Sequence, residues 1–160
     1  MKSIGLVYSS NRKRGHEIEL AVAREHYGLF VGEEEPYDVD FEFIILEVKS
    51  CVEWVSSKTD GVVYRKPGRF LMREGPHEEL VGIASRMGKE AYYCFVGTPR
   101  HDDGRIETRL KKFKEKWISW HDVDRMVKES GKKRSLMTKW HGQPVPVKYY
   151  YLYYNEVFAD

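Results

Sequence analysis

Residues 36–50 read PYDVDFEFIILEVKS, a stretch that places four carboxylates and one lysine around an apolar run. Residues 37–41 alternate between polar and apolar side chains, whereas residues 43–48 are almost continuously apolar. The first pattern is typical of a half-buried strand, and the second of a strand covered on both faces in the middle of a sheet. The stretch therefore predicts a central strand that forms a hairpin, or one bent strand, with the residues before it.

Two acids in this stretch, Asp38 and Glu47, would face each other across a hairpin that turns tightly. Glu42 and Phe43 would form the turn, with Glu42 facing solvent. Facing carboxylates repel unless a cation lies between them, and oxygen-only ligation suits Mg²⁺ or Mn²⁺. Phe43 is unusual in a turn, so a longer or bulged turn that brings Asp40 opposite Glu47 stays open.

Lys49 lies two positions after Glu47, so both side chains leave the same face of a strand. Beside a metal at Glu47, the Lys49 ammonium could orient or help to deprotonate a bound water and stabilise the developing negative charge. Val48 would point the opposite way, into the core. The plainer interpretation is a surface ion pair beside the solvent-facing acids of an amphipathic edge strand.

The chain around this stretch predicts alternating helices and strands. Residues 76–88 open with proline and acids, repeat apolar side chains at helical spacing and stop at glycine, so they predict a helix. A buried strand at residues 91–96 follows after a short turn, which indicates an α/β layer. We expect an α/β fold with a central mixed β-sheet flanked by helices. The other expected elements are helices at residues 12–27 and 121–128, strands at 29–31 and 117–120, and loops with a minor hairpin at 52–75.

The composition indicates one soluble globular domain, because 41% of the 160 residues are hydrophobic and 32% are charged. No apolar run approaches the ~20 residues of a membrane span, and the N-terminus lacks the apolar region of a signal peptide. Cys51 and Cys94 lie far apart in the sequence and have no metal-ligand spacing. We therefore expect an intracellular, cytoplasmic protein in a reducing compartment, without a membrane partner.

Charge is unevenly distributed along the chain, although the net charge is only +2. Acids dominate residues 17–53, whereas basic residues cluster at 2–14 and at 100–139. A basic surface around an acidic centre suits metal-dependent phosphodiester chemistry, provided that these segments meet in space. The six histidines are scattered along the sequence and predict no metal site.

The pattern of an aspartate, a short gap and then Glu47-Val-Lys-Ser50 on an apolar strand resembles the PD-(D/E)xK nucleases, the restriction-endonuclease-like superfamily. Within that superfamily the chain is most similar to the archaeal Holliday junction resolvases and their viral relatives. Their opening helix has basic residues and a glycine before Glu-x-Glu-Leu, as in Arg12-Lys-Arg-Gly15 followed by Glu17-Ile-Glu-Leu20. Their later Leu-x-x-x-(Ala/Ser)-x-Arg-x-Gly helix and buried strand match residues 80–88 and 91–96.

The resemblance implies a restriction-endonuclease-like fold and a Mg²⁺- or Mn²⁺-dependent DNA endonuclease, selective for Holliday junctions or other branched DNA in recombination. Asp38, Glu47 and Glu17 would bind the metal. Lys49 would position the attacking water, and Glu19 is the reserve candidate for the role of Glu17. Paired cuts need two active sites, so the resemblance also implies a homodimer.

Two other functions stay open. The chain could be a nuclease of duplex or single-stranded DNA or of RNA, or a non-catalytic nucleic-acid-binding protein that keeps the nuclease fold. Three glutamates at residues 33–35 replace the basic, glycine-rich loop of the resolvases, and they would repel a phosphate backbone.

The C-terminal part of the chain has no counterpart in the resemblance. We divide the chain into a nuclease-like domain at residues 1–130 and an aromatic extension at residues 131–160, which packs on that domain or on a partner subunit. The run YYYLYY at residues 149–154 predicts an edge strand that completes the sheet or a two-fold interface, with base stacking as the alternative.

Overall fold

The computed structural model describes residues 11–32 and 35–159, so two of the three glutamates of the acidic loop lie outside it. Outside the tyrosine-rich C-terminal segment, the helices and strands expected from the sequence are confirmed, with ends that shift by a few residues. In chain order the elements are α1 (Asn11–Glu25), β1 (Leu29–Phe30), β2 (Val39–Asp40), β3 (Ile44–Val52), β4 (Trp54–Thr59), β5 (Val62–Pro67), β6 (Arg69–Arg73), α2 (Glu74–Arg86), β7 (Glu90–Thr98), η2 (Leu110–Lys112), β8 (Lys114–Ser119), α3 (Trp120–Glu129), β9 (Lys133–Trp140), β10 (Gln143–Tyr153) and α4 (Tyr154–Val157).

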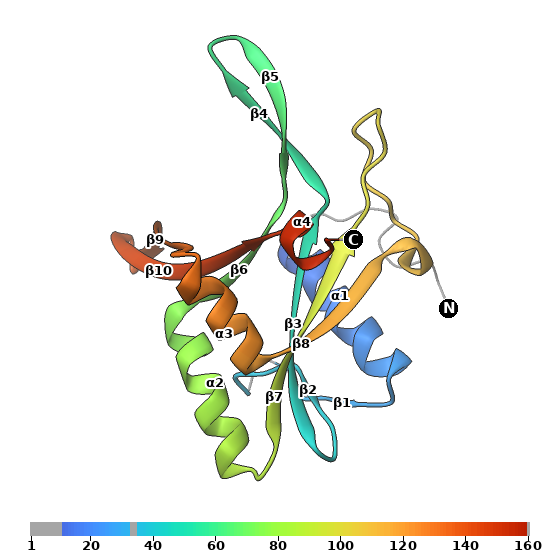
Figure 1. Ribbon diagram of the computed structural model, residues 1–160, viewed down its shortest axis with the longest axis vertical. Coiled ribbons are helices and arrows are strands. Elements are labelled where there is room, and N and C mark those ends of the chain that lie inside the picture. The colour runs from blue at the N-terminus through green and yellow to red at the C-terminus, as the bar shows by residue number, and fades with distance from the viewer. Residues whose placement is uncertain (1–10, 33–34, 160) are drawn as a thin grey trace.

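A mixed five-stranded sheet in the order β1-β2-β3-β7-β8 forms the centre of the fold (Figure 1). Strands β3 and β7 run parallel, while β1, β2 and β8 pair antiparallel with their neighbours. The parallel pair is connected through α2, which follows from the need of a parallel pair for a crossover. The predicted α/β class with a mixed sheet is therefore confirmed, and β3 is the central strand.

The β2–β3 hairpin has the tight turn that the sequence predicted. Val39 pairs with Leu46, and the amide of Phe41 donates to the carbonyl oxygen of Ile44 at 3.0 Å. Phe43 stands at the turn with 73% of its surface exposed. The apolar side chain of Phe43 is therefore left largely in solvent, but its presence in the turn does not shift the strand register.

The two faces of the sheet pack against different helices (Figure 1). Successive side chains of β3 point to opposite faces, so Ile45 packs in one core cluster and Leu46 in the other. Leu80 of α2 belongs to the cluster of Ile45, together with residues of α3. Ile18 of α1 belongs to the cluster of Leu46. Both faces are covered, which explains the unbroken apolar run of the central strand.

The C-terminal extension forms a second sheet with an internal segment of the chain. Strand β10 lies between β6 and β9, so the tyrosine run up to Tyr153 belongs to the middle strand of a three-stranded sheet, and Tyr154 begins α4. This corrects the prediction of an edge strand on the main sheet. Tyr150 and Leu152 point into the core shared with Phe70, whereas Tyr149 and Tyr151 lie on the opposite face. Local sequence could not reveal this pairing, because β6 and β10 are far apart along the chain.

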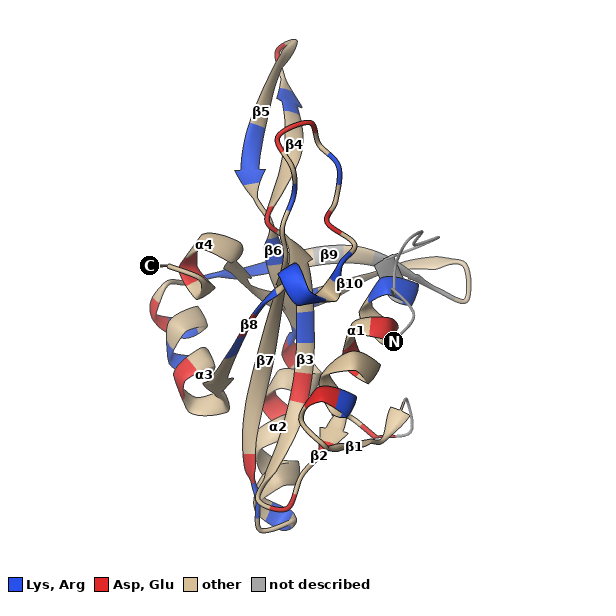
Figure 2. Ribbon diagram, turned by 90° about the vertical axis from the view of Figure 1, so that its right-hand side faces the viewer, with Lys and Arg blue, Asp and Glu red and all other residues tan. Residues whose placement is uncertain are grey.

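Strands β4 and β5 form a two-stranded hairpin that projects from the body of the molecule (Figures 1 and 2). It continues directly from β3 and returns through Gly68 into β6. Most of its side chains are exposed on both strands. The minor hairpin expected in residues 52–75 is thus confirmed, but it is a long projection and not a compact loop.

No helix in the described part of the chain is both long and apolar enough to cross a membrane. Cys51 and Cys94 are both buried, and their thiols are free.

Gly68 provides a prediction about stability, because a side chain does not fit at this position. A Cβ atom there would overlap the backbone carbonyl group of Val52. Gly68→Ala should therefore lower the free energy of unfolding by about 2 kcal/mol, since backbone must shift. Urea unfolding measures this change. The control is Gly75→Ala in α2, where a Cβ meets no atom within 4 Å. A Gly68 variant as stable as the Gly75 variant would contradict the packing described.

Candidate active site

A cavity of about 950 Å³ opens between α1, the β2–β3 hairpin and the second sheet. Its floor includes three of the residues singled out by the sequence, Asp38, Glu47 and Lys49. The other residues around it come from α1, β1, the β1–β2 connection, α2 and the strands β6, β9 and β10. They are Lys13, His16, Glu19, Phe30, Gly32, Glu35, Pro36, Leu71, Arg73, Pro76, Glu79, Met137, Val147 and Tyr149.

Asp38 and Glu47 are brought together by the hairpin register. The pairing of Val39 with Leu46 places Asp38 opposite Glu47 when it is continued by one residue. The amide of Asp38 donates to the carbonyl oxygen of Leu46 at 2.9 Å, and Oδ2 of Asp38 accepts from the amide of Val48 at 2.7 Å. The Asp38 carboxylate is therefore held on the central strand by a backbone donor.

Glu47 is a half-buried carboxyl group in an unfavourable place for a negative charge. Burial raises its pKa well above the ordinary value, and the Lys49 ammonium opposes this shift. A hydrogen bond with Asp38 and the charges of Asp38 and Glu19 raise the pKa further. The carboxylates are thus close enough to interact, and a divalent cation would relieve the cost of ionising Glu47.

Lys49 lies one strand step beyond Glu47 and lines the same cavity. Val48, between them, is 5% exposed and packs in the core on the other face of the sheet. The strand alternation predicted from the sequence is confirmed. A carboxylate and an ammonium therefore leave β3 side by side, next to the Asp38 carboxylate.

The structure brings Glu19, and not Glu17, to the cavity. Glu19 lines the cavity wall, and its charge acts on Glu47. Glu17 does not line it, and its Oε2 is buried without a hydrogen-bond partner among the described residues. Two residues separated by two positions on a helix point about 200° apart, so both cannot face one site. Glu19, the reserve candidate, is therefore the glutamate of this pair that lines the cavity, and Glu17 is not.

Asp40, the reserve candidate for the facing acid, lies away from the cavity. Its Oδ1 accepts a hydrogen bond from the Lys89 ammonium at 2.6 Å, and both side chains are largely buried. Glu42, at the hairpin turn, is exposed. The four carboxylates of residues 36–50 thus separate into two in the cavity, one in an ion pair and one facing solvent.

The cavity carries more acids than bases among the described residues that line it. Five carboxylates face three Lys or Arg side chains there. Arg73, Glu79 and Tyr149 were not singled out as site residues, because they come from β6, α2 and β10 and reach the cavity through the fold. Exposed and buried side chains alternate along β6, so Arg69, Leu71 and Arg73 lie on its exposed face, but the apolar run from Phe70 to Met72 gave no sign of this in the sequence.

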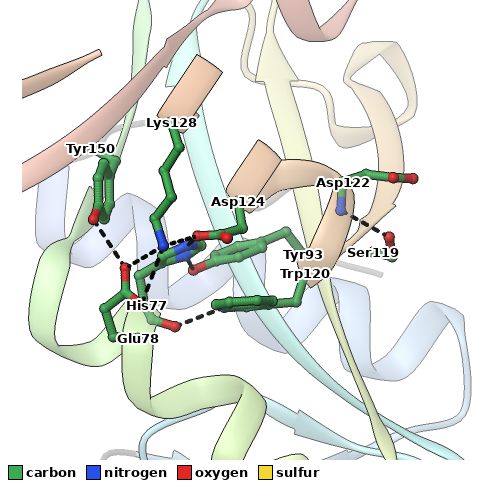
Figure 3. A network of polar contacts seen from close by, with 9 residues as sticks. All are labelled: His77, Glu78, Tyr93, Ser119, Trp120, Asp122, Asp124, Lys128 and Tyr150. Atoms are coloured by element: carbon green, nitrogen blue, oxygen red, sulfur yellow. Dashed lines mark hydrogen bonds and ion pairs between the residues drawn. The ribbon is translucent and has the colours of Figure 1, made fainter. Parts of the chain in front are cut away.

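A network of polar contacts is centred on the buried His77 (Figure 3). Tyr93 of β7 pairs in register with Glu47, and its hydroxyl group shares a 2.6 Å hydrogen bond with Nδ1 of His77. Nε2 of His77 hydrogen bonds to Asp124 of α3 at 3.0 Å. The indole of Trp120 donates to the His77 carbonyl oxygen at 2.7 Å. The network joins β7, α2 and α3 behind the cavity.

Two groups of acids with a histidine could hold a metal elsewhere in the described chain. One group is His77, Glu78 and Asp124, but the Lys128 ammonium already lies 3.2 Å from Glu78 and 2.8 Å from Asp124 (Figure 3). The other group comprises Glu25, His26 and Glu115 on the surface near α1, where His26 and Glu115 are 2.8 Å apart. A protein cation thus takes the place of a metal in the first group.

Among the described residues, the carboxylates that line the cavity do not form a group of three ligand atoms as close together as in these two clusters. Mg²⁺ usually takes only one or two protein carboxylates, and it keeps waters or substrate phosphates as its other ligands. Asp38 and Glu47, with Glu19 on the wall, fit that requirement. Their oxygen-only chemistry suits Mg²⁺ or Mn²⁺ better than a nitrogen- and sulfur-binding metal.

A comparison of the chain with protein-family models, curated proteins and solved structures finds no match. Its function is therefore inferred from the fold and from the residues of the cavity.

The raised pKa of Glu47 predicts how stability depends on pH without metal. Between the ordinary carboxyl pKa of about 4.5 and the raised value, folded Glu47 keeps a proton that the unfolded chain has lost. The contribution to stability is thus present at low pH and is lost as pH rises through this window. Glu47→Gln should remove this dependence and raise the free energy of unfolding at neutral pH by about 1 kcal/mol.

Urea unfolding in a chelator at two pH values, about 5 and about 8, tests this prediction. The control is Glu42→Gln, which changes an exposed carboxylate of the same hairpin. A Glu47→Gln variant that is less stable than the parent protein at both pH values would show that the Glu47 carboxylate is not held in an unfavourable environment.

Proposed function

We propose that the protein is a metal-dependent nuclease that hydrolyses phosphodiester bonds in DNA. The observation that carries this proposal is the meeting of Asp38 and Glu47 in one cavity, with Lys49 one strand step further along. Facing carboxylates and an adjacent ammonium are the groups needed to hold a divalent cation and a phosphate together. We therefore assign the enzyme to metal-assisted hydrolysis.

The order of the elements also supports the proposal. A helix, an antiparallel run of β1, β2 and β3, a second helix and a strand parallel to β3 occur in this order, with β4, β5 and β6 inserted between β3 and the second helix. This order is expected for a restriction-endonuclease-like fold, which the PD-(D/E)xK resemblance implies. Asp38, Glu47 and Lys49 then have the positions that carry the motif.

Asp38 and Glu47 would hold Mg²⁺ or Mn²⁺, with Glu19 contributing directly or through a water. The bound ion would supply charge neutralisation and would lower the pKa of a coordinated water. Asp38 is oriented for this role by the amide of Val48, 2.7 Å from its Oδ2. A fixed carboxylate needs little reorganisation, so it binds the ion in a defined place.

Lys49 and Arg73, two of the three Lys or Arg side chains that line the cavity, would contact the phosphates of the substrate. The Lys49 ammonium would donate to a phosphate oxygen or to the attacking water, because it leaves the strand beside Glu47. Arg73, at the end of β6, would bind a neighbouring phosphate of the strand. Both contacts grow stronger as negative charge develops during hydrolysis.

The resemblance makes branched DNA, including Holliday junctions, the first substrate to test and implies a homodimer. Duplex DNA, single-stranded DNA and RNA are the alternatives. Glu35 lines the cavity, and its negative charge would repel a phosphate backbone, so we expect the substrate strand to lie away from Glu35. We also propose a reducing intracellular compartment, which the free thiols of Cys51 and Cys94 support.

The experiment incubates the purified protein with labelled junction, duplex, single-stranded DNA and RNA in Mg²⁺ or Mn²⁺, with chelator as the control. We expect cleavage of at least one DNA substrate that requires metal and is lost in Lys49→Met. Binding without cleavage of any substrate would favour a nucleic-acid-binding protein that keeps the fold. Cleavage of RNA alone would redirect the proposal to RNA.

A further inference from the structure

We propose that the β4–β5 hairpin, called the arm below (residues 54–67), binds the groove of a nucleic acid duplex next to the strand held in the cavity. This inference rests on the proposed nuclease function, and it adds a separate contact surface to it. The arm was expected from the sequence only as a minor hairpin, and the active site does not require it.

The arm has little protein around it to stabilise its conformation. An isolated two-stranded hairpin is marginally stable in water. Both of its strands are largely exposed, and the exposed fractions of Val62, Val63 and Tyr64 are 50%, 66% and 50%. Exposed apolar side chains that gather on one projection indicate a contact surface.

The base of the arm is nevertheless fixed to the body. Two guanidinium groups lie over the ring of Trp54, with Arg65 at 4.0 Å and Arg100 at 4.7 Å from its centroid. Arg100 donates to the carbonyl oxygen of Trp54 at 2.9 Å. Arg65 donates to the carbonyl oxygen of Asp102 at 2.8 Å, in the loop beside the arm. A projection fastened in this way presents its outer half in a defined direction.

The chemistry of the arm fits a nucleic acid better than a second copy of the chain. Three cations, Lys58, Arg65 and Lys66, accompany a single acid, Asp60. Arg65 is paired with Asp102 at the base, so Lys58 and Lys66 are the exposed cations that would contact phosphates. Four hydroxyl groups lie among them and can donate to phosphates or base edges. In a two-fold interface between arms the same cations would face one another. The hydroxyl-bearing residues are Ser56, Ser57, Thr59 and Tyr64.

The shape and position of the arm also suit a duplex. A two-stranded β-ribbon fits the major groove of B-DNA, which is about 12 Å wide. Strand β3, which carries Glu47 and Lys49, continues past Glu53 into β4. A strand rises about 3.3 Å per residue, so the chain from Lys49 to the turn at Asp60 spans at most about 36 Å. That reach is close to one turn of a duplex, about 34 Å.

The test uses an arm-shortened variant in which residues 58–63 are replaced by Asn-Gly. Ser57 and Tyr64 are paired across the arm, so a two-residue turn can join them. Trp54 and Arg65 stay in place at the base. A second variant, Lys58→Glu, changes only an exposed charge and guards against a folding defect. Both are made with Asp38→Asn so that binding is measured without cleavage.

Fluorescence anisotropy then measures the affinity for a labelled duplex and for a short single strand. We expect both variants to bind the duplex at least about 10-fold more weakly, with a shallower salt dependence, and to bind the short strand unchanged. An unchanged duplex affinity would overturn the proposal. If sedimentation then shows that shortening the arm turns a dimer into a monomer, the occupant is a second copy.

Cleavage by the arm-shortened protein with Asp38 intact separates this inference from the proposed function. Metal-dependent cleavage of a short single strand at the parent rate, together with weakened duplex binding, supports both. If the parent protein binds the duplex but cleaves no substrate, and shortening the arm weakens that binding, the result supports the role of the arm and rejects the nuclease function. If the arm-shortened enzyme is active and binds the duplex as tightly as the parent, the role of the arm is rejected and the nuclease function stands.

Discussion

Asp38→Asn is expected to reduce metal-dependent cleavage by about 10³-fold or more, which corresponds to about 4 kcal/mol of transition-state free energy. The amide keeps an oxygen that can accept from the amide of Val48, now 2.7 Å from Oδ2 of Asp38. The fold should therefore persist, while one anionic ligand opposite Glu47 is lost. Single-turnover cleavage of the preferred substrate in Mg²⁺ and in Mn²⁺ measures the effect.

Asp40→Asn is the matched control, because it makes the same chemical change two residues along the same strand. Asp40 is engaged with Lys89 at 2.6 Å and does not line the cavity. We expect cleavage within a few-fold of the parent rate, with a small loss of stability from the broken ion pair. Equal loss of activity in both variants would mean that the hairpin as a whole, and not Asp38, supports the reaction.

His77→Ala is expected to lower the free energy of unfolding by about 3 kcal/mol. His77 is 1% exposed and stacks on Trp120 and Tyr93, with ring centroids 4.9 Å and 5.7 Å away. Its removal leaves a cavity and deprives the Tyr93 hydroxyl group and Asp124 of hydrogen bonds. Urea unfolding measures the change, with one common slope of the unfolding free energy against urea concentration fitted to both proteins.

His121→Ala is the control for this variant. His121 is an exposed histidine of α3 that also contacts the Trp120 ring, so it shares the residue type and a neighbour with His77. We expect a change below about 0.5 kcal/mol. A His77 variant as mildly affected as the His121 variant would show that the network behind Glu47 contributes little to the fold.

The central part of the fold could be predicted because its signals are local. The alternation of residues 37–41 and the apolar run at 43–48 predicted both strands. The same pattern placed Asp38 opposite Glu47 once a tight turn was assumed. Period-two alternation decides which side chains share a face, so the relation of Glu47 to Lys49 also followed.

The choice between Glu17 and Glu19 could not be made in this way. The motif Glu-x-Glu-Leu contains both residues, and the resemblance favoured the first. The rotation of α1 decides, because Ile18 packs into the core and turns Glu19 toward the cavity. The partial apolar stripe of this helix predicts its rotation only weakly. The packing of α1 against β3 determines which of the two glutamates faces the cavity.

The far wall of the cavity is the part that sequence patterns missed. Leu71 and Arg73 of β6 and Val147 and Tyr149 of β10 reach it only because two distant segments pair. Pairing across more than 70 residues leaves no periodic signal in either segment. The tyrosine run was interpreted as an edge strand for the same reason.

Crystals grown with Mn²⁺ and measured at the manganese absorption edge test the metal site most directly. We expect an anomalous peak within coordination distance of the Asp38 and Glu47 carboxylates, about 2.2 Å, which Asp38→Asn removes. A peak found only at Glu25, His26 and Glu115, or no peak in the cavity at millimolar Mn²⁺, would contradict a metal-dependent nuclease site at Asp38 and Glu47.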